Sequence, residues 1–249
     1  MDRIIILSDQ QARFHDPQTI RAVNKFVEDF QPHTLVNAGD LFDFEALSNY
    51  RKSQDAKTSV MRDWSAGRAI LRKQRGILPE ARIVLIEGNH EARLHKYLLD
   101  NAPALSEVPS LDIPYFLGLQ DFDIEYVEPY GAGIDWHGVL IYHGGYVRKH
   151  SAYTARAEYE EAGTSGVSGH THRLGAHYHT DRTGSHAWFE NGCLCVVNRK
   201  GEPPSERGPR INNWQQGFTY GYFDKGIWSL FPVSITKHKF IVESKVYEP

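Results

Sequence analysis

Cysteine is scarce in this sequence of 249 residues, which contains only Cys193 and Cys195. Two cysteines separated by one residue cannot build the disulfide framework typical of small secreted domains. We interpret both as small apolar residues of a strand, and their pattern favours a reducing compartment.

Net charge and long apolar runs are also lacking. The chain carries 28 lysines and arginines against 31 aspartates and glutamates, a formal net charge of -3, so no global field attracts nucleic acid or an anionic membrane. The first apolar run, residues 4–7, follows Met1-Asp2-Arg3 directly and is too short for a signal peptide or a membrane span. We expect a soluble, cytoplasmic protein without a membrane partner. No pattern indicates the oligomeric state.

Linkers, repeats and low-complexity segments are absent as well. With 41% hydrophobic residues, the chain is long enough for one domain with a substantial core. The polar motifs described below extend from Asp9 to His172, so a domain boundary inside that range would divide them. We therefore predict a single domain, residues 1–249, in which residues from about 199 onward form a β-rich C-terminal extension.

The order of apolar patterns predicts an α/β fold. In the first half, strands at 4–7, 35–38 and 83–86 alternate with helices at 17–31 and 56–74. Such alternation is typical of parallel strands joined by helical crossovers. The second half has short strands at 139–142, 166–168 and 188–198, a helix at 152–162, and aromatic strands after Asn213. We predict a layered domain in which two sheets pack face to face with helices outside.

Polar clusters follow the predicted buried strands at their carboxyl ends. They are Asp9-Gln10-Gln11, Gly39-Asp40-Leu41-Phe42-Asp43, Gly88-Asn89-His90-Glu91, His143-Gly144-Gly145 and Gly169-His170-Thr171-His172. Strand carboxyl ends form the natural crevice of an open α/β sheet, so we expect the clusters to converge. Unpaired charge is costly in a core, and bound metal ions would offset that cost. Carboxylate, amide and imidazole ligands together suit Mn²⁺, Mg²⁺, Fe or Zn²⁺.

This ordered set of motifs resembles the calcineurin-like metallophosphoesterase family. The motifs D-x-[H/Q], GDxxD, GNHE, H and GHxH occur in that order along the chain. The similar region extends from residue 4 to about 198. The resemblance implies a four-layer α/β/β/α fold, which is a β-sandwich flanked by helices. It also implies a site for two divalent metal ions.

The resemblance further implies a role for each motif residue. One metal ion would be held by Asp9, Gln11, Asp40 and His172. The other would be held by Asp40, Asn89, His143 and His170, so that Asp40 bridges the two. His90 would lie near the leaving-group oxygen as general acid or transition-state stabiliser. Asp43 would orient a ligand or a histidine by hydrogen bonding.

Gln11 departs from the commonest form of the family, which has histidine at this position. Because an amide oxygen is a harder ligand than an imidazole nitrogen, we expect a preference for Mn²⁺, then Mg²⁺, over Zn²⁺. Two divalent cations outweigh the charge of Asp9, Asp40 and a bridging hydroxide, so the site would attract a phosphate group.

We therefore expect a dinuclear metal-dependent phosphoesterase, either a phosphodiesterase or a phosphatase. Its substrate would be a small phosphate ester, nucleotide-like or derived from nucleic acid, and nucleic acid itself is not indicated by the net charge. His15 and Arg93 border the motifs and are additional candidates for substrate contact, with ordinary solvated positions as the alternative. Segment 199–210 is expected to be an exposed loop, with guidance of an anionic substrate as the alternative.

Two other functions remain open. A non-catalytic protein could keep this fold as a scaffold for partner binding, although family members of that kind usually lose the motif histidine or several ligands, and here His90 and all seven persist. A protein phosphatase is disfavoured because Phe44, rather than arginine, follows Asp43.

Overall fold

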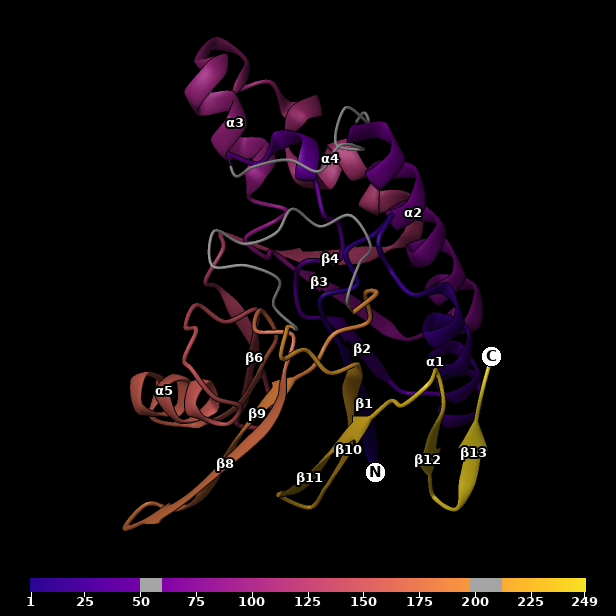
Figure 1. Cartoon of the computed structure of the whole chain (residues 1–249), viewed down its shortest axis with the longest axis vertical. Coiled ribbons are helices and arrows are strands. Elements are labelled where there is room, and N and C mark those ends of the chain that lie inside the picture. Colours follow the sequence, from indigo (N-terminus) through magenta and orange to yellow (C-terminus); the bar gives the residue numbers. More distant parts are fainter. Residues whose placement is uncertain (50–59, 198–211) are drawn as a thin grey trace.

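The structure, a computed structural model, describes residues 1–49, 60–197 and 212–249. A six-stranded and a five-stranded sheet pack face to face, and helices cover both outer sides (Figure 1). Three expected features fall partly or wholly outside the described residues. They are the start of the helix at 56–74, the end of the strand at 188–198 and the loop at 199–210.

The six-stranded sheet has the order β11-β10-β1-β2-β3-β4. Its parallel strands are β1 (Asp2–Leu7), β2 (Thr34–Asn37), β3 (Arg82–Ile86) and β4 (Ile124–Val127). Two antiparallel strands, β10 (Gly217–Asp224) and β11 (Ile227–Ser234), continue the sheet beyond β1. The short apolar runs of the first half therefore predicted β1, β2 and β3, whereas β4 was not predicted.

The five-stranded sheet has the order β5-β6-β7-β9-β8. The strands are β5 (Gly133–Trp136), β6 (Val139–Tyr142), β7 (Ser165–Ser168), β8 (Leu174–Asp181) and β9 (Gly184–Asn191). β6, β7 and β9 are parallel, and the two edge strands are antiparallel to their neighbours. The strand predicted at 188–198 begins earlier and ends at Asn191, because Gly192 turns the chain with a φ of 74°.

Strand β1 shows how the sequence builds two layers of core. Ile4 and Ile6 point between the sheets, where they join a buried cluster that includes Val139, Ile141 and Val167. Ile5 and Leu7 point the opposite way, into the cluster beneath the helices. Each fully buried isoleucine or leucine contributes about 1.5–3 kcal/mol. A strand that is buried on both faces has no polar alternation, as its sequence shows.

Helices form the two outer layers. The α-helices are α1 (Pro17–Phe30), α2 (Val60–Ile77), α3 (Arg93–Asn101), α4 (Ile113–Leu117) and α5 (Tyr153–Ala162). Short 3-10 helices are η1 (Glu45–Leu47), η3 (Pro103–Leu105), η4 (Pro109–Leu111) and η5 (Leu119–Phe122). α1 and α2 lie outside the larger sheet and α5 outside the smaller one (Figure 1). This is the four-layer α/β/β/α arrangement that the motifs predicted.

The C-terminal strands complete the larger layer. β10 lies between β1 and β11, and a hairpin of β12 (Phe240–Val242) and β13 (Lys245–Tyr247) packs against α1. Phe26 of α1 is the centre of this contact, with ring centroids 5.1–6.1 Å from those of Phe30, Phe218, Tyr220, Phe240 and Tyr247. The aromatic residues of this segment therefore serve mainly as core.

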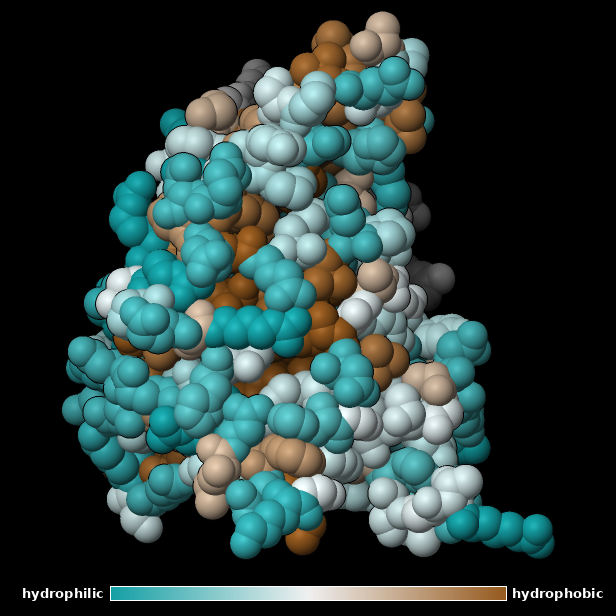
Figure 2. Space-filling view, turned by 180° about the vertical axis from the view of Figure 1, so that it is seen from behind, coloured by the Kyte–Doolittle hydropathy of each residue, from teal (hydrophilic) through white to brown (hydrophobic). Residues whose placement is uncertain are grey.

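Viewed from behind, the surface is mostly hydrophilic around a hydrophobic middle (Figure 2). The tip formed by α3 and η3 is also apolar there, and it carries the half-exposed Leu99 and Leu105. None of the helices in the described ranges combines the length and hydrophobicity needed to cross a bilayer.

Candidate metal centre

The carboxyl ends of five strands bring the predicted ligands together. β1, β2 and β3 of the larger sheet lead to the first three polar clusters, and β6 and β7 of the smaller sheet lead to the last two. The two sheets thus meet at one polar site, lined by residues from both halves of the sequence. This convergence is the one that the strand-end pattern predicted.

Most of these ligand positions have a left-handed backbone. The φ angles are 50° at Asp9, 46° at Gln11, 52° at Asp40, 68° at His170 and 57° at His172. Such conformations cost non-glycine residues about 1–3 kcal/mol each and persist only where the surroundings impose them. Here the backbone NH of Asp9 donates to Gly39 O (3.1 Å), and that of Gln11 donates to Asp40 O (2.9 Å). The fold therefore holds strain at this site, which is typical of functional sites.

Asp9, Gln11 and His172 form the first ligand group. His172 Nε2 lies 3.1 Å from Asp9 Oδ1 and 3.2 Å from Gln11 Nε2. Asp9 Oδ1 is buried and accepts no hydrogen bond from the residues that the structure describes. A cation between these atoms would satisfy the carboxylate oxygen. Rotation of the Gln11 side-chain amide by half a turn would bring Oε1 toward the cation in place of Nε2. The residues present therefore fit a metal ion.

Asp40, Asn89, His143 and His170 form the second ligand group. His143 Nε2 lies 3.1 Å from Asn89 Oδ1 and 3.4 Å from Asp40 Oδ1. His143 Nδ1 lies 2.9 Å from Ala38 O, so a proton on Nδ1 leaves Nε2 free as a ligand. Ligand atoms of Asp40, His143 and His170 all lie within 4.8 Å of one another. This group also fits a metal ion.

The two groups adjoin through the main chain, since the backbone NH of Gln11 donates to Asp40 O. The backbone NH of His170, in the second group, donates to Asp9 Oδ2 of the first group at 3.0 Å. Burial by itself raises the pKa of Asp40, but the imidazoles of His143 and His90 hold that pKa well below its usual value. Asp40 is therefore a carboxylate at neutral pH, as a bridging ligand must be.

Two glycines allow this close approach. A Cβ at Gly39 would lie 2.4 Å from His143 Nδ1, and a Cβ at Gly88 would lie 2.2 Å from Asp40 Oδ1. Any larger residue at either position would displace a ligand side chain. The glycines of the second and third motifs are therefore needed for space, and Gly39 also has a φ of 85°.

Glu91 has a role that the sequence analysis did not assign. Its buried carboxylate accepts hydrogen bonds from the backbone NH groups of Asp40 (2.9 Å), Phe42 (2.8 Å) and Gly88 (2.9 Å). Burial and the negative charge of Asp40 raise the pKa of Glu91 to about 7. Glu91 thus ties the loops after β2 and β3 together. In the sequence, the position of Glu91 directly after His90 in the third motif was the signal that could have indicated this role.

His90, Asp43 and Arg93 lie together at the wall of a cleft. His90 Nδ1 is 2.8 Å from Asp43 Oδ1, and His90 Nε2 is 3.5 Å from Asp40 Oδ2. Arg93 Nη1 donates to Asp43 O at 2.6 Å. The cleft measures about 260 Å³ and is lined by Gln11, Asp40, Asp43, Glu45, Ser48, Asn89, His90, Arg93, His170, His172 and Trp214. The structure thus brings Arg93 to the ligands.

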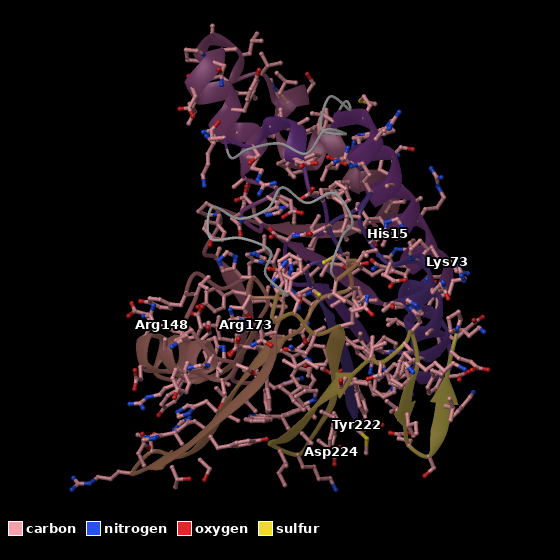
Figure 3. The ribbon with its side chains drawn as sticks, in the orientation of Figure 1. His15, Lys73, Arg148, Arg173, Tyr222 and Asp224 are labelled. Carbon is pink, nitrogen blue, oxygen red and sulfur yellow. The ribbon has the colours of Figure 1, made fainter. Side chains whose placement is uncertain are left out.

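His15 is placed differently. It is absent from the cleft lining given by the described residues, and its main chain forms a bridge with Cys195. Figure 3 shows it on the side of the molecule where α1 and α2 lie. Burial lowers the pKa of the His15 imidazole. Within the described part of the chain, His15 therefore lies outside the cleft lining.

Trp214 and the two cysteines surround His172. The Trp214 ring centroid lies 4.4 Å from that of His172, and Cys195 Sγ lies 3.9 Å from His172 Nδ1. Cys193 and Cys195 are both buried free thiols, but they follow β9, which ends at Asn191, instead of lying in a strand as predicted. Trp214 was expected in a terminal sheet, but it lines the cleft, because the chain segment before β10 passes over the site.

A sequence profile described as calcineurin-like phosphoesterase matches residues 2–205. The chain belongs to the calcineurin-like phosphoesterase family. Members of this family generally hydrolyse phosphate esters and typically bind two metal ions. The match begins with β1 and extends past the last motif, so it includes every ligand position named above.

Similar proteins come from two phages. Gene 54 protein of Mycobacterium phage D29 is 32% identical over 257 residues, covering 99% of this chain and 98% of that protein. Gene 54 protein of Mycobacterium phage L5 is 31% identical over 256 residues, with the same coverage. Among solved structures, Chaetomium thermophilum Vps29 has a TM-score of 0.50 and 12% identity, covering 100% of this chain and 93% of that one. At that identity, the likeness concerns the fold alone.

Proposed function

We propose that the protein is a dinuclear metal-dependent hydrolase of phosphate esters. The ligands would be the seven residues of the two groups, with Asp40 shared between them. The observation that carries the proposal is the position of His90, which lines the open cleft beside Asp40 and is backed by Asp43. A protein that used this fold only for partner binding would have no need of a histidine held in this way.

Each side chain of the site would have a separate chemical role. Two divalent cations, Mn²⁺ by preference, would supply an acidified water molecule and neutralise charge on the phosphate oxygens. His90 would hold a proton at Nε2 for the leaving-group oxygen, because Asp43 engages its Nδ1. The guanidinium of Arg93 would bind a phosphate oxygen that does not react. Trp214 would exclude water from the side of His172.

The small volume of the cleft favours a substrate that places only its phosphate end inside the cleft. Pockets that enclose a drug-sized ligand measure about 300–1,000 Å³, and this cleft of about 260 Å³ is smaller. We expect it to hold the phosphate and its nearest substituents, with the remainder of a nucleotide-like substrate outside. The buried free thiols of Cys193 and Cys195 support a reducing, cytoplasmic location.

The test is an assay of the purified protein on p-nitrophenyl phosphate and bis(p-nitrophenyl) phosphate, with Mn²⁺ and with chelator. We expect turnover that requires metal and is lost in Asp40→Ala and His90→Ala. Metal content measured in parallel should fall in Asp40→Ala and be retained in His90→Ala. Full activity in both variants, or bound metal without turnover of either ester, would overturn the proposal, and the second outcome would favour a non-catalytic scaffold.

A further inference from the structure

The loop between β6 and α5 exposes basic side chains beside the metal ligands. It begins at the ligand His143, and residues 145 and 147–150 are exposed. Arg148 and Lys149 form no ion pair with a carboxylate of the described residues. The guanidinium of Arg148 lies 4.7 Å from the ring centroid of Tyr146. The loop therefore presents two free positive charges a few residues from a ligand.

Arg173 adds a third positive charge from the other ligand-bearing loop. It directly follows His172, and its Nη1 donates to Arg148 O at 2.6 Å. Its Nε is buried and has no hydrogen-bond partner among the described residues. Figure 3 shows Arg148 and Arg173 near each other beside α5. We call Arg148, Lys149 and Arg173 the basic patch.

Buried carboxylates fix the basic patch relative to the ligands. Glu158 of α5 accepts from the backbone NH groups of Gly145 and Tyr146 at 3.0 Å each, directly after His143. Glu190 accepts from Thr171 Oγ1 at 2.8 Å, between the ligands His170 and His172, and from the backbone NH of Ala152 at 2.6 Å. The patch and three of the ligands are thus held by one hydrogen-bonded framework.

We infer that the basic patch binds the backbone phosphates of a single-stranded nucleic acid on one side of the phosphate held in the cleft. This inference rests on the proposed function and narrows its substrate to polynucleotides. A strand that leaves the small cleft past His170, which lines it, reaches the patch, and Glu158 and Glu190 hold the loops that carry the patch. Tyr153, which is 60% exposed, and the adjacent ring of His150 offer bases a stacking surface.

The net charge of -3 does not oppose this inference, because the patch is local. Its three cations come from two short segments. Glu158 and Glu190, which hold the loop backbone, are buried and occupied by backbone donors, and the exposed Glu161 of α5 accepts from the Tyr146 hydroxyl at 3.4 Å. Contacts to phosphate supply most sequence-independent affinity, and aromatic stacking adds to it. The patch therefore fits recognition of a strand without regard to its sequence.

The first test measures binding of a fluorescein-labelled phosphorothioate oligothymidine of about 20 nucleotides to the Mn²⁺-loaded protein. The variant is Arg148→Ala/Lys149→Ala, and the matched control is Arg72→Ala/Lys73→Ala, an exposed Arg-Lys pair on α2, where Figure 3 labels Lys73. We expect the patch variant to bind at least about tenfold more weakly. The slope of log Kobs against the logarithm of the salt concentration should fall by about 1.4 in magnitude, since each of the two lost phosphate contacts contributes about 0.7. The control should bind like the wild type. Equal binding by all three proteins, or an equal loss in the control, would overturn the inference.

A second measurement separates this inference from the proposed function. Turnover of bis(p-nitrophenyl) phosphate, which is too small to reach the patch, should be the same in wild type and patch variant, whereas KM for a cleavable oligothymidine should rise. Loss of small-ester turnover in the patch variant would contradict a role in binding the polymer.

Two outcomes distinguish the inference from the proposed function. If the wild type hydrolyses no ester but binds the oligonucleotide through the patch, the proposed function is wrong and the basic patch is still a binding surface for nucleic acid. If the wild type hydrolyses the small diester but binds the oligonucleotide independently of the patch, the proposed function stands and the inference fails.

Discussion

Nδ1 of His90, in the third motif, lies 2.8 Å from Oδ1 of Asp43, the last residue of the second motif. The contact joins the second and third motifs across the cleft wall. Because Asp43 engages one nitrogen, the other nitrogen of His90 faces Asp40 at 3.5 Å. We propose that Asp43 acts through His90, and through Arg93, whose Nη1 lies 3.6 Å from the same Asp43 oxygen, so that its effect is separable from that of the ligands.

Replacing Asp43 should impair turnover without removing metal. Asp43→Asn keeps the shape of the side chain but loses the charge that orients His90, so we expect kcat to fall about 10–100-fold. Metal content, measured by mass spectrometry, should stay at the wild-type level. Asp121→Asn, which alters an exposed carboxylate paired with Arg68, is the control and should leave kcat unchanged. Loss of metal from Asp43→Asn would instead identify Asp43 as a ligand.

Gln11 should set the metal preference. After stripping and reloading, we expect the wild type to be most active with Mn²⁺ and less active with Zn²⁺, because an amide oxygen is a hard ligand. Gln11→His should raise the ratio of Zn²⁺ to Mn²⁺ activity, and Gln11→Leu, of similar volume but without a ligand atom, should lower metal occupancy. A Zn²⁺ optimum in the wild type would count against the assignment.

The stability of the metal-free protein should fall at alkaline pH. Burial by itself lowers the pKa values of His143 and His172, but Asp40 and Asp9 more than offset it and raise them to about 9 and about 10. A raised folded-state pKa contributes stability that is fully present below the unfolded value of about 6.5 and is lost as pH rises through the folded value. The loss should therefore fall between pH 7 and 10.

Urea midpoints of chelator-treated protein across this pH range provide the measurement. The midpoint should decrease from neutral to alkaline pH, and the decrease should be smaller in His172→Gln, which cannot be protonated. With Mn²⁺ bound, both imidazoles are neutral ligands and this contribution should disappear. A midpoint that does not change in the metal-free wild type would contradict the predicted charge state.

Phe26 should matter for stability and not for chemistry. Phe26→Ala leaves a cavity among five aromatic rings beneath the C-terminal hairpin, so we expect a loss of about 3–5 kcal/mol and a fall in Tm of about 2–4 °C for each kcal/mol. Turnover per folded molecule and metal content should persist. Ile241→Ala, at an exposed position of β12, should change Tm little. An equal loss in both variants would mean that the hairpin does not pack on α1 as described.

Local patterns predicted much of the fold. The run from Ile4 to Leu7 specifies a strand that is buried on both faces, and Asp16-Pro17 specifies the start of α1, where Asp16 accepts from the backbone NH groups of Gln18 and Thr19. Strand β8 was not predicted, although His177 and His179 alternate like strand residues, because most of its side chains are exposed and no apolar run marks it, and β9 was predicted to begin only at residue 188. Pairing with β9, and the place of β9 beside β7 in the sheet, fix this strand, and neither is encoded in the pattern of one segment.

The sequence by itself determined the ligand types and their order, because carboxylate, amide and imidazole groups at strand ends have few uses other than holding metal. Only the tertiary structure decided which residues outside the motifs join them. It brought Arg93 to the cleft and left His15 away from it, and it turned Trp214 toward His172. It also placed Arg148 beside Arg173, which are distant in the sequence. Such neighbours depend on how two sheets pack, and a linear pattern records only the residues along one strand or helix.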